Sequence, residues 1–354
     1  METGHVDKLV TGLAAYRRRR YFSIAGLLVL LVIVIGVACS VGTAHISISE
    51  VWRVLFSKQS WANPLGNSHS NIVISVRLPR VILAGLAGAA LSTAGATYQG
   101  LFRNPLADPY LLGVAQGSAL GAVIGLLFPF SHSAWIGSVP MLALCGGLIT
   151  IVILYSLARV GRTLPMTTLI LAGVALGAFL TAIISFLEYE SGDKLHGVIF
   201  WLMGSFSNAE WKDVYVLFPY LIVCLIPIYL YSRPLNLIQM DEEQAKQLGV
   251  NVEKVKLILL LTATLITAAA VSFAGCIGFV GLVIPHAVRL IWGPDYRFLL
   301  PLSTIVGAIF LILTDTLCRT VAGGGAEIPV GIITAFVGAP FFLYLLRQKK
   351  QVFF

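Results

Sequence analysis

Side chains able to carry out chemistry are few in this chain, and their spacing fits no common catalytic or nucleotide-binding pattern. No Gly-Lys dipeptide occurs, so the phosphate-binding loop GxxxxGK[ST] is absent. The charges that lie deepest in apolar sequence are Asp315 and Arg319, near one end of a hydrophobic stretch. Proton- and sodium-coupled carriers usually bury carboxylates or histidines at mid-membrane. The pattern therefore favours neither an enzyme nor a carrier that couples to ions by itself.

Histidines and cysteines are scattered rather than clustered. Single histidines fall in predicted loops and at helix ends: His45, His69, His132, His196 and His286. The five cysteines lie in or beside apolar runs, without metal-ligand spacing: Cys39, Cys145, Cys224, Cys276 and Cys318. Buried thiols in such runs usually pack as small apolar side chains. We therefore predict no metal site, no cofactor and no disulfide framework.

The most informative stretch of the sequence is Arg77–Gly113. It begins with two arginines around Leu78-Pro79, and it then crosses about twenty uncharged residues, many of them Gly, Ala, Ser or Thr. It ends in a polar turn, residues 103–109, from which a second apolar run starts at once. Small side chains let helices approach backbone to backbone. This segment is therefore predicted to form an inner wall of a helix bundle, with basic residues at one mouth.

Composition identifies an integral membrane protein. Hydrophobic residues make up 58% of the 354 and charged residues only 11%, against about 25% charged in soluble domains. A crossing needs roughly 20 apolar residues, and the charge-free run at residues 257–288 is broken near Ala274-Gly275, so it is split into two helices. The fold expected is all-α, with ten transmembrane helices near residues 21–41, 77–101, 110–128, 136–157, 165–187, 213–231, 256–273, 277–292, 299–320 and 329–346. The break between the third and fourth is expected at residues 129–133.

The distribution of Lys and Arg sets the expected orientation. With the N-terminus in the cytoplasm and ten crossings, both ends of the chain are inside, and most of the 24 basic residues are cytoplasmic. The basic residues then outside are Arg53, Lys58, Arg77, Arg80, Lys194, Lys212 and Arg319. The net charge of +8 is explained by this topology and by anionic lipid headgroups, so no nucleic-acid partner is expected.

The first apolar run is expected to stay in the protein rather than to be removed as a signal peptide. It follows the basic run Arg17–Arg20, but it is too long, starts late, and lacks a convincing cleavage site. We treat residues 1–354 as a single transmembrane domain. Its larger loops are predicted at 42–76 and 188–213 outside, with short interfacial helices at Ser49–Leu55 and Leu195–Phe206, and at 232–256 inside.

The inside loop carries the densest charge and a short predicted helix. Residues 239–250 have an acidic start at Asp241 and a glycine stop at Gly249, which are helix boundary signals. Ala245 and Leu248 are expected to share one face, giving a small apolar stripe in the cytoplasm. An ordinary solvated loop helix would explain the charges, whereas the stripe favours a docking surface for another protein.

A set of motifs in a fixed order resembles one family over nearly the whole length. The motifs are RLPR at 77–80, NPLADP at 104–109, LAGVALG at 171–177, FWLMGSF at 200–206, AKQLG at 245–249, GFVGLVIPH at 278–286, GPDYRFLLP at 293–301, and EIPVGIITAFVGAPFF at 327–342. The chain is similar in these to the FecCD-type permeases of ABC importers for iron siderophores, haem and cobalamin. This resemblance implies the type II ABC importer permease fold, with ten crossings in each subunit and a pathway between two permease subunits, most simply a homodimer.

The resemblance also implies partners and site residues. Arg77, Arg80 and Arg319 match arginines that dock acidic residues of an extracytoplasmic substrate-binding protein; lipid-facing anchoring is the alternative for them. ATP-binding cassette ATPase subunits would grip the inside loop at Asp241, Ala245, Leu248 and Gly249. Asn104 and Leu106 match a cytoplasmic gate, and a second constriction falls at Met166 and Thr167, where Met166 departs from the small hydroxyl residues of some members.

The function expected is transport through the cytoplasmic membrane of a bacterium or archaeon. An iron chelate, either a ferric siderophore or haem, is favoured as the cargo, and a cobalamin permease of the same family is the alternative. A secondary transporter would work without the ATPase, and a signalling membrane protein would show no flux. No motif in the sequence separates the chelates, because selectivity is expected mainly in the binding protein.

Overall fold

The computed structural model describes residues 3–42, 44–128, 137–161, 163–321 and 327–350. The described residues are helical apart from turns, loops and one isolated bridge between Val160 and Thr163. The predicted break at residues 129–133 lies outside them. The helices in chain order are α1 (Thr3–Ser40), α2 (Ile48–Phe56), α3 (Lys58–Ala62), η1 (Pro64–Gly66), α4 (Ser68–Asn71), η2 (Ile72–Arg77), α5 (Leu78–Leu101), η3 (Pro109–Leu112), α6 (Val114–Leu127), α7 (Ser138–Ala158), α8 (Met166–Glu190), η4 (Gly192–Lys194), α9 (Leu195–Leu202), α10 (Trp211–Leu230), α11 (Ser232–Met240), α12 (Glu242–Gln247), α13 (Val252–Ala274), α14 (Val280–Trp292), α15 (Tyr296–Val321) and α16 (Val330–Lys350).

Each of the ten predicted crossings coincides with a helix, but they differ in length. Within the described residues, seven helices are long and apolar enough to cross a membrane, and three apolar helices are shorter, at Val114–Leu127, Val280–Trp292 and Val330–Tyr344. The 14 residues of α6 extend about 21 Å at 1.5 Å per residue, which is less than the roughly 30 Å of a hydrocarbon core. Membrane-spanning character is therefore clear, while length alone does not establish ten full crossings.

The predicted split of residues 257–288 is confirmed. Helix α13 ends at Ala274, followed by Gly275 at φ +72°. Helix α14 begins at Val280 after Phe279, whose φ of +68° is left-handed and unusual for a residue with a side chain. The chain therefore turns back here, as the distribution of basic residues requires.

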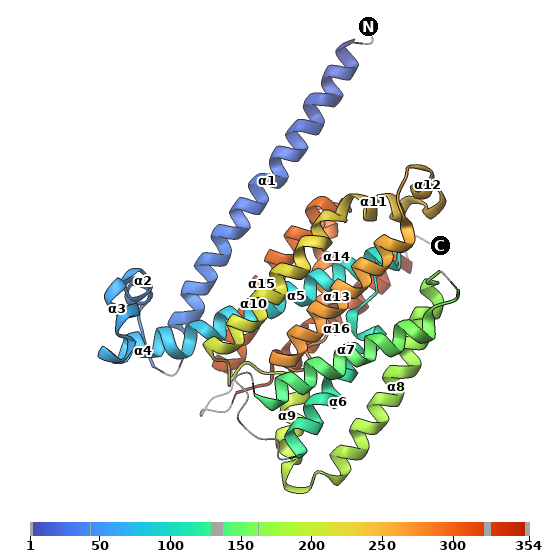
Figure 1. The fold of residues 1–354 in the computed structure, drawn as a ribbon. Coiled ribbons are helices and arrows are strands. Elements are labelled where there is room, and N and C mark those ends of the chain that lie inside the picture. The colour runs from blue at the N-terminus through green and yellow to red at the C-terminus, as the bar shows by residue number, and fades with distance from the viewer. Residues whose placement is uncertain (1–2, 43, 129–136, 162, 322–326, 351–354) are drawn as a thin grey trace.

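The helices surround α5, as the small side chains of that segment predict. Of its 24 residues only Ile82 and Leu86 are not buried, and it packs against α10, α13, α14 and α15 (Figure 1). Gly88 faces the backbone of Gly307 in α15, and Gly95 faces the backbone of Gly281 in α14, with no room for a Cβ. The small residues thus bring three backbones together in the middle of the bundle.

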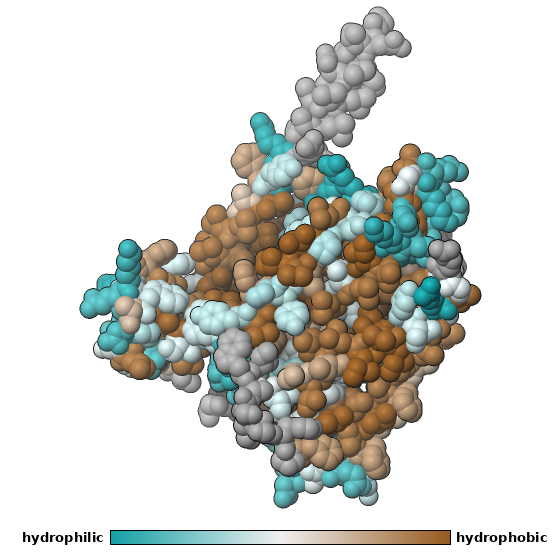
Figure 2. All heavy atoms as spheres, in the orientation of Figure 1, coloured by the Kyte–Doolittle hydropathy of each residue, from teal (hydrophilic) through white to brown (hydrophobic). Residues whose placement is uncertain are grey.

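The long helices alternate in direction, so the bundle has two ends. The end that we call the α12 end holds α11, α12, the C-terminal ends of α5 and α7, and the starts of α8, α13 and α15 (Figure 1). The end that we call the α2 end holds α2–α4, the start of α5 and the C-terminal end of α15. In Figure 2 a broad hydrophobic surface lies over the helices, and hydrophilic residues gather beyond it near α12 and near α2 and α3.

Helices are present at both positions where short interfacial helices are predicted. Helix α2 contains residues 49–55, begins at a Ser47 side-chain cap and buries Val51 and Val54. Helix α9 covers the first part of residues 195–206, and the chain then turns at Gly204, whose carbonyl accepts from Val330 N at 2.9 Å. Cys39, Cys224 and Cys318 are buried, as core packing predicts, whereas Cys145 is exposed; all five thiols are free.

Candidate functional site

The loop between α10 and α13 is anchored to the bundle by α11. The Gln239 side chain donates to Gly100 O at the end of α5, at 2.8 Å, and Asn236 donates to the Asp295 carboxylate at 2.8 Å. Burial opposes the charged form of Asp295, but hydrogen bonds from Arg297 and Asn236 outweigh it and lower the pKa of Asp295 to about 2. The carboxylate is therefore charged at neutral pH and holds α11 beside the start of α15.

Helix α12 has the boundaries that the sequence predicts. The Asp241 side chain caps it by accepting from Gln244 N at 2.9 Å, and Gly249, at φ +84°, follows its end and donates to Lys246 O at 2.9 Å. Leu248 is 68% exposed. The prediction that Ala245 shares this exposed face is wrong, because Ala245 is 1% exposed and packs into the core. The exposed apolar surface comes instead from Leu248 and Met240.

The first predicted gate segment is a tight turn at the α12 end, which we call the Asn104 turn (residues 102–108). The Asn104 side chain accepts from Leu106 N at 3.0 Å, and Ala107 N donates to Asn104 O at 3.1 Å. Arg103 adopts φ +48°, a left-handed conformation that fixes the direction of the chain after α5. Asn104 is exposed and Leu106 half-buried, so the turn presents a polar and an apolar side chain at the edge of the subunit.

The second predicted gate segment is the turn before α8, which we call the Met166 turn (described residues 159–161 and 163–167). Val160 and Thr163 exchange two backbone hydrogen bonds of 3.1 Å, and Leu164 is buried. Met166 packs partly against the core, whereas Thr167 is exposed. The chain after the Asn104 turn contacts α8 farther along, where Gly113 lies against Gly173 and Gly177. The two turns thus lie at the same end of the bundle, and α8 packs against the chain that follows the first turn.

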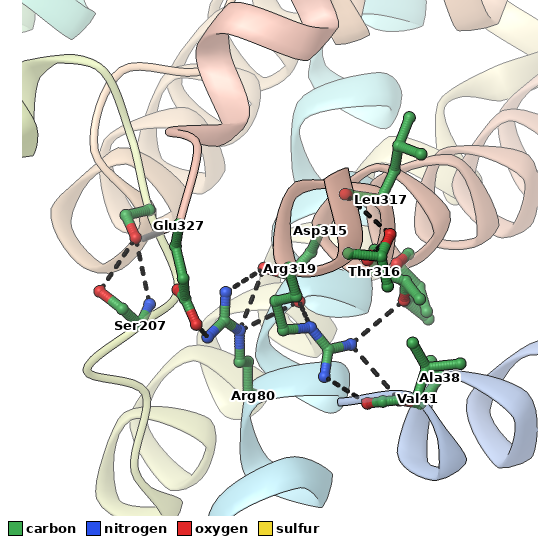
Figure 3. Close-up of polar contacts among 12 residues, drawn as sticks. Ala38, Val41, Arg80, Ser207, Asp315, Thr316, Leu317, Arg319 and Glu327 are labelled. Atoms are coloured by element: carbon green, nitrogen blue, oxygen red, sulfur yellow. Dashed lines mark hydrogen bonds and ion pairs between the residues drawn. The ribbon is translucent and has the colours of Figure 1, made fainter. Parts of the chain in front are cut away.

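At the α2 end, two of the predicted docking arginines share one carboxylate (Figure 3). Arg80 donates to Asp315 from Nε and Nη2, at 2.8–3.1 Å, and from Nη1 to Glu327 at 2.8 Å. Arg319 Nε lies 3.2 Å from the same Asp315, and its Nη1 and Nη2 point at Val41 O and Ala38 O. Asp315 is 1% exposed. Two cations and two carboxylates therefore join α5, α15 and the segment just before α16.

The third predicted docking arginine closes the end of α1. Arg77 donates to Cys39 O at 2.8 Å, to Ser40 O at 3.0 Å and to Ala44 O at 2.6 Å. The last carbonyls of a helix have no partner within the helix, and a basic side chain satisfies them. Arg77 thus joins α1 to the turn before α5.

All three arginines lie at one end of the bundle, as predicted, but none projects from the surface in this conformation. Arg77 and Arg80 are buried, the side chain of Arg319 is 8% exposed, and all three are hydrogen-bonded within the chain. Glu327, on the outer side of Arg80, is the partly exposed member of the cluster. Docking by these arginines stays a prediction, and a partner's carboxylate would have to compete with Glu327 for Arg80.

A hollow of about 1020 Å³ opens beside α9. Its wall includes cationic and aromatic side chains, Lys194, His196 and Trp201, and the serines at 205 and 207. Among the described residues no group of three His, Cys, Asp or Glu side chains could hold a metal ion.

Sequence reasoning missed a second ion-pair cluster, at the α12 end. Lys256 donates to Glu242 at 2.6 Å and lies 3.7 Å from Glu253, and Glu253 also accepts from Leu164 N at 3.0 Å. Helical periodicity in the sequence could have revealed that Lys256 is buried. Lys256 falls on the same face of α13 as Val252, Val255, Leu259 and Leu260, all of which are buried.

The fold is that of a polytopic membrane protein with a charged helical loop at one end. Residues 28–348 match the sequence model of the FecCD transport family. The chain is 46% identical over 279 residues to the cobalamin import system permease protein of Halobacterium salinarum, covering 79% of this chain and 74% of that one. It is 39% identical to the hemin transport system permease protein of Yersinia pestis, covering 92% and 95%.

A solved structure agrees with the same assignment. A metal-chelate type ABC transporter, solved in an inward-facing conformation, aligns with a TM-score of 0.78 and 33% identity, covering 92% of this chain and 98% of that one. The chain belongs to the FecCD transport family, and it is a membrane-spanning permease subunit of an ABC transporter. Such permeases work with ATPase and binding-protein partners.

Proposed function

We propose that this chain is the permease of an importer that carries an iron chelate, haem included, into the cytoplasm. The observation that carries the proposal is α12, a capped helix at one end of the bundle that presents Leu248 to solvent. A side chain of this kind suits a contact with an ATPase subunit. Basic residues near that end, such as Arg159, Arg233 and Lys254, support placing it, with both termini, in the cytoplasm.

The cargo is inferred from relatives. The relative in Yersinia pestis is named for hemin, and the solved neighbour is of metal-chelate type. The Halobacterium salinarum relative is named for cobalamin import, which makes a cobalamin permease the second candidate. Identifying the ligand that co-purifies with the partner binding protein would separate a ferric chelate or haem from a cobalamin.

A homodimer fits the position of the gate residues. Asn104 and Thr167 are exposed on the single subunit, so a closed constriction needs a facing surface. We propose that a second copy supplies that surface and that cargo passes between the two subunits. Met166, half-buried at the start of α8, would then shape the gate through packing, with the exposed Thr167 facing the pathway.

Replacing Leu248 by Arg should strongly weaken docking of the ATPase. A charged side chain in an apolar contact is expected to weaken association by about thirtyfold or more, equivalent to about 2 kcal/mol. The measurement is the affinity of the purified ATPase for the permease in nanodiscs, together with uptake by proteoliposomes. The matched control is Leu65→Arg, since Leu65 is 79% exposed and lies at the opposite end. Normal association of the Leu248 variant would overturn the docking assignment.

Replacing Glu327 by Gln should tighten capture of the binding protein. Glu327 accepts a hydrogen bond from Arg80 Nη1 at 2.8 Å, so it competes with any carboxylate of a partner that binds Arg80. Weakening a partly exposed ion pair is worth up to about 1 kcal/mol, which corresponds to a gain in affinity of up to about fivefold. Binding of the loaded partner to nanodiscs measures this, with Glu190→Gln as the exposed control. Unchanged affinity would leave Arg80 with a structural role alone.

A further inference from the structure

The cluster around Lys256 spans three parts of the chain that are distant in sequence. Lys256 lies one turn into α13 and is only 4% exposed. Its ammonium group donates to Glu242 Oε2 at 2.6 Å and lies 3.7 Å from Glu253 Oε1. An ammonium group buried without counter-charge is strongly disfavoured, so Lys256 holds both carboxylates in place.

On one side the cluster reaches α12 and the Asn104 turn. Glu242 is the first residue of α12, and its second oxygen, Oε1, lies 3.6 Å from Arg103 Nη2. Arg103 directly precedes Asn104 and has a left-handed backbone conformation. A shift of the Arg103 side chain is therefore expected to change the direction of the turn. One carboxylate therefore connects the proposed ATPase contact to the first gate segment.

On the other side the cluster reaches the Met166 turn. Glu253 Oε2 accepts from Leu164 N at 3.0 Å. Leu164 is buried and lies two residues before Met166. A hydrogen bond to a carboxylate is stronger than one to a neutral acceptor, so this contact fixes the backbone where α8 begins. The second gate segment is thus held by the residue that also flanks Lys256.

In the described part of the chain, the neighbouring charges on α12 and α13 make no hydrogen bond to Glu242, Lys256 or Glu253, although Lys246 interacts with both carboxylates through space. Glu243 pairs with Lys246 at the surface at 2.7 Å, and Lys254 is exposed. What distinguishes Glu242, Lys256 and Glu253 from these neighbours is that their contacts connect α12 with both gate segments.

We propose that Glu242, Lys256 and Glu253 form a relay of positioning residues that passes a displacement of α12 to both gate segments. The relay rests on the proposed function, in which α12 is the ATPase contact. Because Arg103 and Leu164 N are held by two carboxylates that both contact one ammonium group, moving α12 shifts the Asn104 turn and the Met166 turn together. Substitutions that break the relay uncouple ATP hydrolysis from gate movement and leave the binding of the ATPase unchanged.

Coupled transport tests the relay in the complete transporter, reconstituted with its ATPase and binding protein. Glu242→Gln and Lys256→Met are compared with Glu190→Gln and Lys254→Met, which make the same changes at exposed positions outside α12. In the two relay variants, cargo moved per ATP should fall about tenfold while association of the ATPase stays at the wild-type level. The control variants should match wild type, and Lys256→Arg should restore coupling because it keeps the charge.

Two results would overturn the relay. One is a wild-type ratio of cargo moved per ATP hydrolysed in Glu242→Gln. Glu242 is partly exposed, so this substitution is not expected to disturb the folding of the core. The other is loss of ATPase association as large as that of Leu248→Arg, because these residues would then belong to the contact itself.

A second measurement needs no ATPase, so it fails independently of the proposed function. A spin label is placed at the exposed Thr167 of the intact permease in nanodiscs, with the exposed Cys145 replaced by Ser. Glu253→Gln and Glu242→Gln should increase the mobility of this label, whereas Glu243→Gln should leave its spectrum unchanged. Identical spectra in all three variants would overturn the relay even if the ATPase docks on α12 as proposed.

Discussion

Replacing Asp315 by Asn is expected to destabilise the folded permease by about 3–5 kcal/mol, the usual cost of breaking a buried ion pair by removing one partner. Asp315 is 1% exposed and accepts hydrogen bonds from Arg80, while Arg319 Nε lies 3.2 Å away. The amide keeps the shape of the side chain but removes the charge that two guanidinium groups share. Arg80 retains Glu327, whereas Arg319 keeps only neutral acceptors.

The measurement is the thermal unfolding midpoint of the detergent-solubilised permease, which should fall clearly in Asp315→Asn. Asp193→Asn is the control, because Asp193 is exposed on η4. The double variant Asp315→Leu with Arg319→Met should recover part of the loss, since it removes a cation together with its counter-charge. Equal midpoints for wild type and Asp315→Asn would show that the cluster adds no stability.

The sequence located this cluster in part. Asp315 and Arg319 stand four residues apart in a helical stretch, which is the spacing of a pair on one helix face. The distribution of basic residues also placed Arg77, Arg80 and Arg319 at the same end. That these side chains turn inward depends on the packing of α5 against α15 and on the carbonyls at the end of α1. Neither is visible in a linear pattern.

The helices were predictable because lipid demands long apolar runs. The break between α13 and α14 followed from charge placement, and the capping of α12 followed from Asp241 and Gly249. Two residues at the α12 end were misjudged for physical reasons. Ala245 is buried because neighbouring elements decide which face of a six-residue helix is covered. Lys256 was treated as the edge of an apolar run, although Glu242, 14 residues earlier, allows it to be buried.

Replacing Gly95 by Leu should prevent formation of a stable bundle. A side chain at Gly95 would meet the backbone of Gly281 in α14, and backbone cannot move aside as a flexible side-chain tip can. Overpacking in a well-packed core costs about 1–3 kcal/mol, occasionally more. A backbone clash between α5 and α14 is expected at the upper end of that range. The variant should show a lower unfolding midpoint and reduced yield of monodisperse protein after extraction.

Gly26→Leu separates this effect from the general consequences of adding a leucine to a membrane helix. Gly26 lies within α1, and a Cβ added there would meet no atom of a neighbouring element within 4 Å. Leucine also has a better helix propensity than glycine by somewhat less than about 1 kcal/mol, so this control should be as stable as wild type or slightly more so. If Gly95→Leu matched it, α5 and α14 would have to separate without cost, which contradicts a bundle built on backbone contact. The small residues of α5 would then serve the transport pathway rather than the packing of its wall.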